Sequence, residues 1–189
     1  MIKLLNHFEA FLLLETTTRK KTFGLLFLSL LLPGHIKYLF VFILISKLLP
    51  ADVNSRRIKM ILSLPFSRSE IFLFAFITGF LIIFSATVIG EAFFIGKTDF
   101  AVFTRLFVFY CAYFGILMLV TTKGADNLTF PVFLLITDLI AGNIGTPETN
   151  VYQLISPLYQ RDFVMSMLLA FFILAVSFAV FIVDRREKW

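Results

Sequence analysis

Long apolar segments with few charged residues limit what this chain can fold into. They include residues 69–95, 100–122 and 163–183. A helix needs about 20 such residues to cross the hydrocarbon core of a bilayer. Hydrophobic residues make up 59% of the chain, and Phe alone occupies 26 of its 189 positions. We therefore predict an all-α polytopic membrane protein with a single transmembrane domain over residues 1–189.

The apolar segments predict about six transmembrane helices. Four of them are expected at residues 69–95, 100–122, 128–144 and 163–183, with a polar loop at 146–162 between the last two. Residues 22–50 are interrupted at Pro33-Gly34-His35. This region is either one long kinked span or a hairpin of two short spans at 18–33 and 36–50. A single span would put the basic groups of 19–21 and 56–59 on opposite sides of the membrane, so we favour the hairpin.

The first residues have the pattern of an amphipathic helix. Leu4, Leu5, Phe8, Phe11 and Leu12 recur at helical spacing, and polar side chains occupy the other side. This pattern predicts a helix over residues 1–15 that lies in the membrane interface and does not cross it. A polar, basic turn is expected to follow at residues 16–21.

The distribution of basic residues predicts the orientation. With six spans, Lys37, Lys97, Arg105 and Arg161 fall on one side, and the other 13 of the 17 Lys and Arg residues fall on the side of both termini. Because basic residues accumulate on the cytoplasmic side, both termini are expected in the cytoplasm. This placement also explains the net charge of +5 without a nucleic-acid partner.

A basic, polar segment, residues 54–68, separates the second and third predicted spans; we call it the elbow. Its first part alternates basic and apolar residues, as in a short amphipathic helix. Pro65 cannot continue that helix. Ser67 lies three residues before Glu70, which is the spacing of a capping box at the start of a new helix. Helix, proline break and capped span together predict a rigid cytoplasmic elbow.

The run Leu62-Ser63-Leu64-Pro65-Phe66-Ser67-Arg68-Ser69-Glu70-Ile71 resembles the LLSLPxSRxEI signature of ABC-2-type transporter permeases, the membrane subunits of ABC exporters. The interfacial helix, the six-span plan, the short basic tail at 184–189 and the Leu154–Tyr159 loop are similar to that family too. The resemblance implies that the elbow is a coupling helix, which docks onto separate cytoplasmic ATPase subunits. ATP and Mg would be bound by those subunits, and a second permease subunit, identical or different, would complete an exporter in a prokaryotic cell membrane.

The resemblance also implies a set of ATPase-coupling residues. They are Arg56, Arg57, Lys59, Met60, Leu64, Pro65, Ser67, Arg68 and Glu70. The basic residues alone would occur on any cytoplasmic loop. An alternative is therefore a non-transport assembly or anchoring subunit, whose basic loop binds another protein or anionic lipid.

Two carboxylates inside predicted spans are candidates for a translocation path. Asp138 lies in the fifth span and Glu91 toward the outer end of the third. Charged side chains are costly inside a membrane and often mark functional sites. Asp138 is expected to line the path, to pair with Arg105, or simply to mark the helix end near the outer interface.

We expect no catalytic, cofactor or metal site in this chain. Gly96-Lys97-Thr98 lacks the glycine spacing and the strand–helix context of a phosphate-binding loop. His7 and His35 are far apart and have no supporting ligands for a metal ion. Cys111 is the only cysteine, which excludes an intrachain disulfide.

Overall fold

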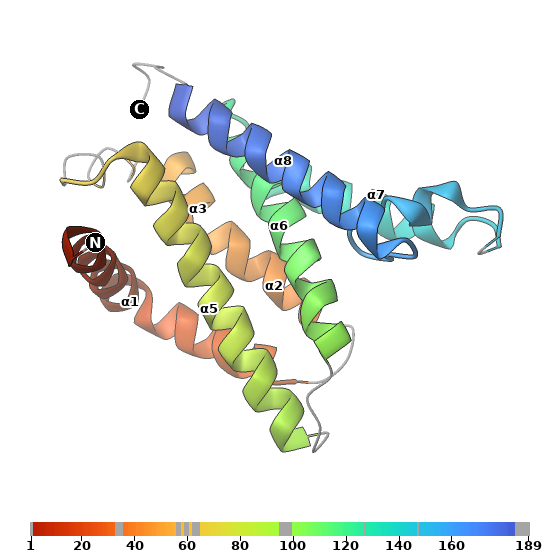
Figure 1. Cartoon of the computed structure of the whole chain (residues 1–189), viewed down its shortest axis with the longest axis horizontal. Coiled ribbons are helices and arrows are strands. Elements are labelled where there is room, and N and C mark those ends of the chain that lie inside the picture. The colour runs from red at the N-terminus through yellow and green to blue at the C-terminus, as the bar shows by residue number, and fades with distance from the viewer. Residues whose placement is uncertain are drawn as a thin grey trace.

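The structure, a computed structural model, describes residues 2–32, 36–55, 58, 61, 65–94, 100–126, 128–146 and 148–183. The regular elements of these residues are helices, with no strand among them (Figure 1). In chain order they are α1 (Ile2–Leu30), α2 (Ile36–Lys47), α3 (Leu49–Asn54), α5 (Arg68–Phe94), α6 (Phe100–Thr122), α7 (Thr129–Asn143), the 3-10 helix η1 (Val151–Leu154) and α8 (Phe163–Val183).

Helices α5, α6 and α8 are the three in the described part of the chain that are long and apolar enough to cross a membrane. The chain is therefore an integral membrane protein. The bounds of these helices agree within one residue with the apolar segments expected at 69–95, 100–122 and 163–183. Helix α7 is also apolar but has 15 residues, which gives it a length of about 22 Å. A straight crossing of the hydrocarbon core needs about 30 Å.

Helix α6 forms the centre of the bundle. It packs against α2, α3, α5, α7 and α8, and its Phe109, Tyr110 and Phe114 are completely buried. Phe72 of α5 joins three helices at one point, because its ring lies 5.3 Å from that of Phe114 and 5.2 Å from that of Phe178 on α8. Such edge-to-face contacts add stabilisation beyond the buried area alone.

The outer face of α5 is apolar and exposed. Leu73, Ile77, Leu81, Phe84 and Val88 are all between 37% and 45% accessible. They recur every three or four residues, so they form one stripe along the helix. An exposed apolar stripe of this length suits the apolar surroundings of a membrane.

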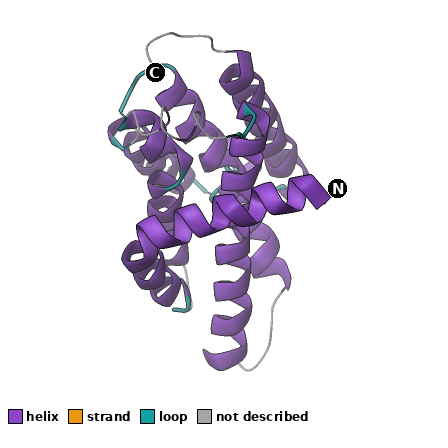
Figure 2. Cartoon of the chain, turned by 90° about the vertical axis from the view of Figure 1, so that its left-hand side faces the viewer, coloured by secondary structure: helices purple, strands orange, loops and turns teal. Residues whose placement is uncertain are grey.

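The prediction of a polar turn at residues 16–21 is wrong. Helix α1 continues through this segment, but it bends at Arg19, where φ is −117° and ψ is 19°. Three threonines precede the bend, and each hydroxyl donates to the carbonyl four residues earlier, at 2.6–2.7 Å. This bonding pattern weakens and bends helices. Figure 2 shows the amino-terminal part of α1 lying across the other helices, as expected of an interfacial helix.

After the bend, α1 and α2 run in opposite directions and contact each other (Figure 1). The break between them falls where the hairpin was expected, at Pro33-Gly34-His35, which lie outside the described residues. Residues 20–30 of α1 extend for about 16 Å and the 12 residues of α2 for about 18 Å. Each piece is therefore shorter than the hydrocarbon core of a bilayer.

Candidate functional site

The structure describes only part of the elbow. Arg56, Arg57, Lys59, Met60 and Leu64 lie outside the described residues. Ile58 and Ile61 are helical, three positions apart, and at most 1% exposed. That spacing puts both side chains on one buried face of a helix. Pro65 is exposed, and Arg68 is the first residue of α5.

Helix α5 begins with the capping box expected from the sequence. The Ser67 amide donates to Glu70 Oε2 at 2.7 Å, and the Glu70 amide donates to Ser67 Oγ at 3.2 Å. These reciprocal bonds satisfy two backbone donors that have no partner within the helix. The chain that leaves the elbow is therefore fixed in direction as it enters α5.

The capped start of α5 contacts the amino-terminal part of α1. His7 Nδ1 lies 3.5 Å from Glu70 Oε1. The ring of Phe66 packs edge-on against the rings of His7, at 5.5 Å, and Phe11, at 6.3 Å. Phe11 also packs against Phe74 of α5 at 5.8 Å. Polar and aromatic contacts together attach the end of the elbow to α1.

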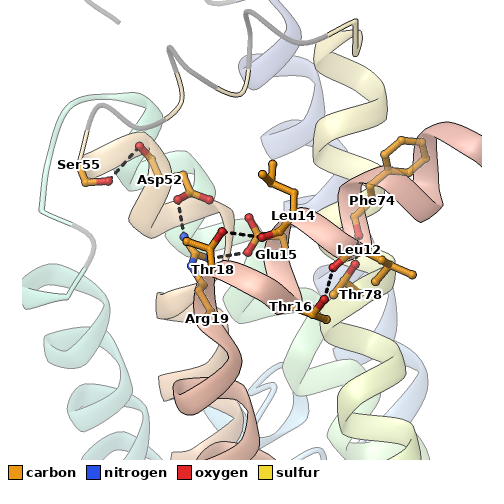
Figure 3. Close-up of polar contacts among 10 residues, drawn as sticks. All are labelled: Leu12, Leu14, Glu15, Thr16, Thr18, Arg19, Asp52, Ser55, Phe74 and Thr78. Carbon is orange, nitrogen blue, oxygen red and sulfur yellow. Dashed lines mark hydrogen bonds and ion pairs between the residues drawn. The ribbon is translucent and has the colours of Figure 1, made fainter.

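A buried charged cluster attaches the beginning of the elbow to the same helix. Arg19 at the bend of α1 binds Asp52 on α3, and its second nitrogen lies 3.0 Å from Glu15 Oε2 (Figure 3). The side chains of Glu15 and Asp52 are 2% exposed, and that of Arg19 is 12% exposed. The planar guanidinium can bind two carboxylates at once, so Arg19 bridges α1 and α3.

Helix α1 therefore holds both ends of the elbow. Asp52, just before the elbow, is bound at Arg19, and Glu70, just after it, is next to His7. Twelve residues of helix separate His7 from Arg19, a distance of about 18 Å along the axis. The residues on either side of the elbow, Asp52 and Glu70, are therefore attached to two points on one helix.

The candidate path residue Glu91 has a cation as its partner. Lys37 Nζ lies 2.9 Å from Glu91 Oε1, and both side chains are at most 4% exposed. Lys37 is in the first turn of α2, and Glu91 is in the last turn of α5. Burial of either charge alone would be costly, so the pair joins these two helix ends.

The candidate path residue Asp138 is held by hydroxyl groups. It accepts hydrogen bonds from Tyr113 Oη at 3.0 Å, Tyr152 Oη at 2.8 Å and Ser156 Oγ at 2.6 Å. Burial and the bond to Asp138 raise the pKa of the Tyr152 phenol, so this group remains a donor. Pairing with Arg105 was one of the alternatives for Asp138; among the described residues no ion pair joins the two, and three hydroxyl groups donate to the carboxylate instead.

The loop after α7 folds back over the end of that helix. The side-chain amides of Asn150 and Gln153 donate to the carbonyls of Ala141 and Gly142, both at 2.7 Å. These bonds satisfy acceptors that the helix end leaves free. A Cβ at Gly142 would lie 1.8 Å from the ring of Tyr159, so glycine is required for this close approach.

The sequence interpretation identified Glu91 and Asp138 but not the groups that bind them. Lys37, Tyr113, Tyr152 and Ser156 come from other elements, and no local pattern indicated them. The Glu15–Arg19 contact had a local signal, since opposite charges four residues apart meet on a helix. Among the described residues, no group of three His, Cys, Asp or Glu side chains could hold a metal ion.

Comparison of the chain with known protein families, with characterised proteins and with solved structures found no match.

Proposed function

We propose that this chain is the permease subunit of an ATP-driven transporter that resembles the ABC-2 type, and that it works as an exporter. Two permease subunits, identical or different, would assemble with two cytoplasmic ATPase subunits that bind ATP and Mg. Both termini and the elbow face the cytoplasm of a prokaryotic cell. The observation that carries this proposal is the attachment of both ends of the elbow to α1.

A coupling element has to transmit force without yielding. When the ATPase subunits close, they push on the elbow. The capping box passes this displacement to α5, because the Ser67 and Glu70 bonds hold the direction of the chain. The Arg19 cluster passes it to α1 and α3. The elbow, α1, α3 and α5 then move together and open the path.

The proposal includes six membrane crossings. Helices α6 and α8 are side by side and run in the same direction, and α5 runs opposite to them (Figure 1). If α6 and α8 both cross toward the cytoplasm, the chain has to return between them. Helix α7 and its ordered loop provide that return, and the α1–α2 hairpin provides the first two crossings. Short helices suffice where neighbouring protein covers their ends.

The test is the activity of a reconstituted complex. The tagged full-length chain is purified with its ATPase subunit, and ATP hydrolysis and transport are measured in proteoliposomes for Pro65→Gly and Arg68→Glu. We expect both variants to insert and to retain ATP hydrolysis, while transport falls about tenfold or more because a flexible or misdocked elbow transmits less displacement. Lys123→Glu is the matched control, since it reverses a charge on the exposed loop after α6.

Two results would contradict the proposal. Normal transport by both elbow variants would show that the elbow is not the coupling element. Purification of the chain without any subunit that carries a phosphate-binding loop would favour the assembly or anchoring alternative, in which the elbow binds a partner but transmits no motion.

A further inference from the structure

A cavity of about 410 Å³ lies between α2, α6, α7 and the loop before α8. Its wall is mainly apolar and includes Leu39, Leu135, Leu139 and Leu158. The volume falls in the range of small-ligand sites, which is about 300–1,000 Å³. Leu39 and Leu139 are 48% and 44% exposed, so the cavity is open to the surroundings of the bundle.

Among the residues that the structure describes, one cation lines this cavity. Arg105 is the sixth residue of α6 and is exposed. Its guanidinium makes no hydrogen bond or ion pair in the part of the chain that the structure describes, and only its backbone carbonyl is engaged, by Gln160 at 2.7 Å. An arginine near a helix end in a membrane protein extends toward the interface, where it meets lipid headgroups.

The charges around the cavity favour an anionic ligand. Asp138 is on the same helix as Leu135 and Leu139, but its carboxylate is 2% exposed and is bound by three hydroxyls. Glu91 is bound to Lys37. Neither described carboxylate thus engages the Arg105 guanidinium, and its five donors suit the oxygens of a phosphate.

Tyr38 and Tyr159 also line the cavity. Tyrosine is enriched where the hydrocarbon core meets the headgroups. The cavity therefore has the kinds of group that a phospholipid requires, with leucines for an acyl chain, tyrosines for the boundary and a cation for the headgroup.

We propose that this cavity binds one anionic phospholipid, with an acyl chain between Leu39, Leu135 and Leu139 and its phosphate at Arg105. This inference depends on the cavity and on Arg105, and it holds whether or not the chain is a transporter subunit. It also differs from binding of lipid by the elbow, because Arg105 belongs to α6 and not to residues 54–68.

Native mass spectrometry of the delipidated full-length chain tests the proposal. The protein is titrated separately with phosphatidylglycerol, with phosphatidylcholine of the same acyl chains and with inorganic phosphate. We expect one phosphatidylglycerol per chain and about tenfold weaker binding of phosphatidylcholine, because charge-assisted hydrogen bonds to Arg105 provide the difference. Inorganic phosphate should neither bind stably nor displace the lipid.

The variants separate headgroup from chain recognition. Arg105→Gln should remove the preference for phosphatidylglycerol, whereas Arg161→Gln, an exposed arginine of the loop before α8 that is outside the cavity, should keep it. Leu39→Trp should weaken both lipids, since it fills the cavity. Helical content, measured by circular dichroism, identifies any misfolded variant. If Arg105→Gln is misfolded, Arg105→Lys is used in its place, with a smaller expected loss of the preference for phosphatidylglycerol.

Three results would overturn the inference. They are equal binding of the two lipids by the unaltered chain, a preference that survives the loss of Arg105, and displacement of the lipid by inorganic phosphate alone. The last result would identify a simple anion site.

Discussion

Arg19 is the cation that binds two buried carboxylates at the bend of α1. Replacing Arg19 by Ala leaves Glu15 and Asp52 without this partner in a buried site. We expect the free energy of unfolding to fall by about 3 kcal/mol, because breaking a buried pair from one side leaves an uncompensated charge. Equilibrium unfolding of the detergent-solubilised chain measures this loss.

Lys20→Ala is the matched control for Arg19→Ala, because it removes a neighbouring exposed cation from the same helix. It should change the free energy of unfolding by less than about 0.5 kcal/mol. Adding Asp52→Asn to Arg19→Ala should recover part of the lost stability, since it removes one of the two carboxylate charges that Arg19 contacts. Equal effects of Arg19→Ala and Lys20→Ala would show that the cluster does not stabilise the bend.

At the scale of elements, a glycine of α5 lies against the backbone that follows α1. A Cβ at Gly90 would lie 2.4 Å from the carbonyl oxygen of Leu31, and backbone cannot move aside as a flexible side chain can. Gly90→Ala should therefore lower the free energy of unfolding by about 1–3 kcal/mol. Thermal unfolding, followed by circular dichroism, measures the effect.

Gly24→Ala is the control for Gly90→Ala, because we do not expect it to lower stability. Gly24 lies in α1 with nothing within 4 Å of the position of a Cβ. Gly24→Ala should leave stability unchanged or raise it by up to about 1 kcal/mol, because alanine favours the helix. If the two alanine variants behave alike, the close contact between α5 and the backbone that follows α1 is absent in solution.

The elements could be predicted from the sequence where a local pattern determined them. An apolar run of the right length fixes both ends of α6 and α8, and the Ser67–Glu70 spacing predicts the start of α5. The bend at Arg19 was missed, because helix propensity does not reveal that three consecutive threonines bond back to the preceding turn.

The long-range contacts of the candidate site could not be predicted in the same way. Lys37 and Glu91 are 54 positions apart, and Tyr113 and Asp138 are 25 apart. The sequence around one residue of each pair does not indicate its partner. Only the packing of α2, α5, α6 and α7 determines which groups meet. The same packing creates the cavity at Arg105.

At the scale of the whole molecule, the directions of the helices determine which side of the membrane each loop faces. Single cysteines in a Cys111→Ala background can report the side of each loop. Cys111 is 1% exposed, so its loss changes no surface group. Ser55→Cys, Lys123→Cys and Glu148→Cys place reporters at three exposed positions. Intact cells are treated with a membrane-impermeant maleimide, and labelling is compared before and after permeabilisation.

Glu148→Cys should react in intact cells, and Ser55→Cys and Lys123→Cys should react only after permeabilisation, because basic loops remain in the cytoplasm. The decisive pair is Lys123 and Glu148, which flank α7. Since α6 and α8 run in the same direction, the chain must return across the membrane between them if both are spans. Labelling of both positions from one side would show that α7 does not cross, and the six-span proposal would then fail even though α5, α6 and α8 remain membrane helices.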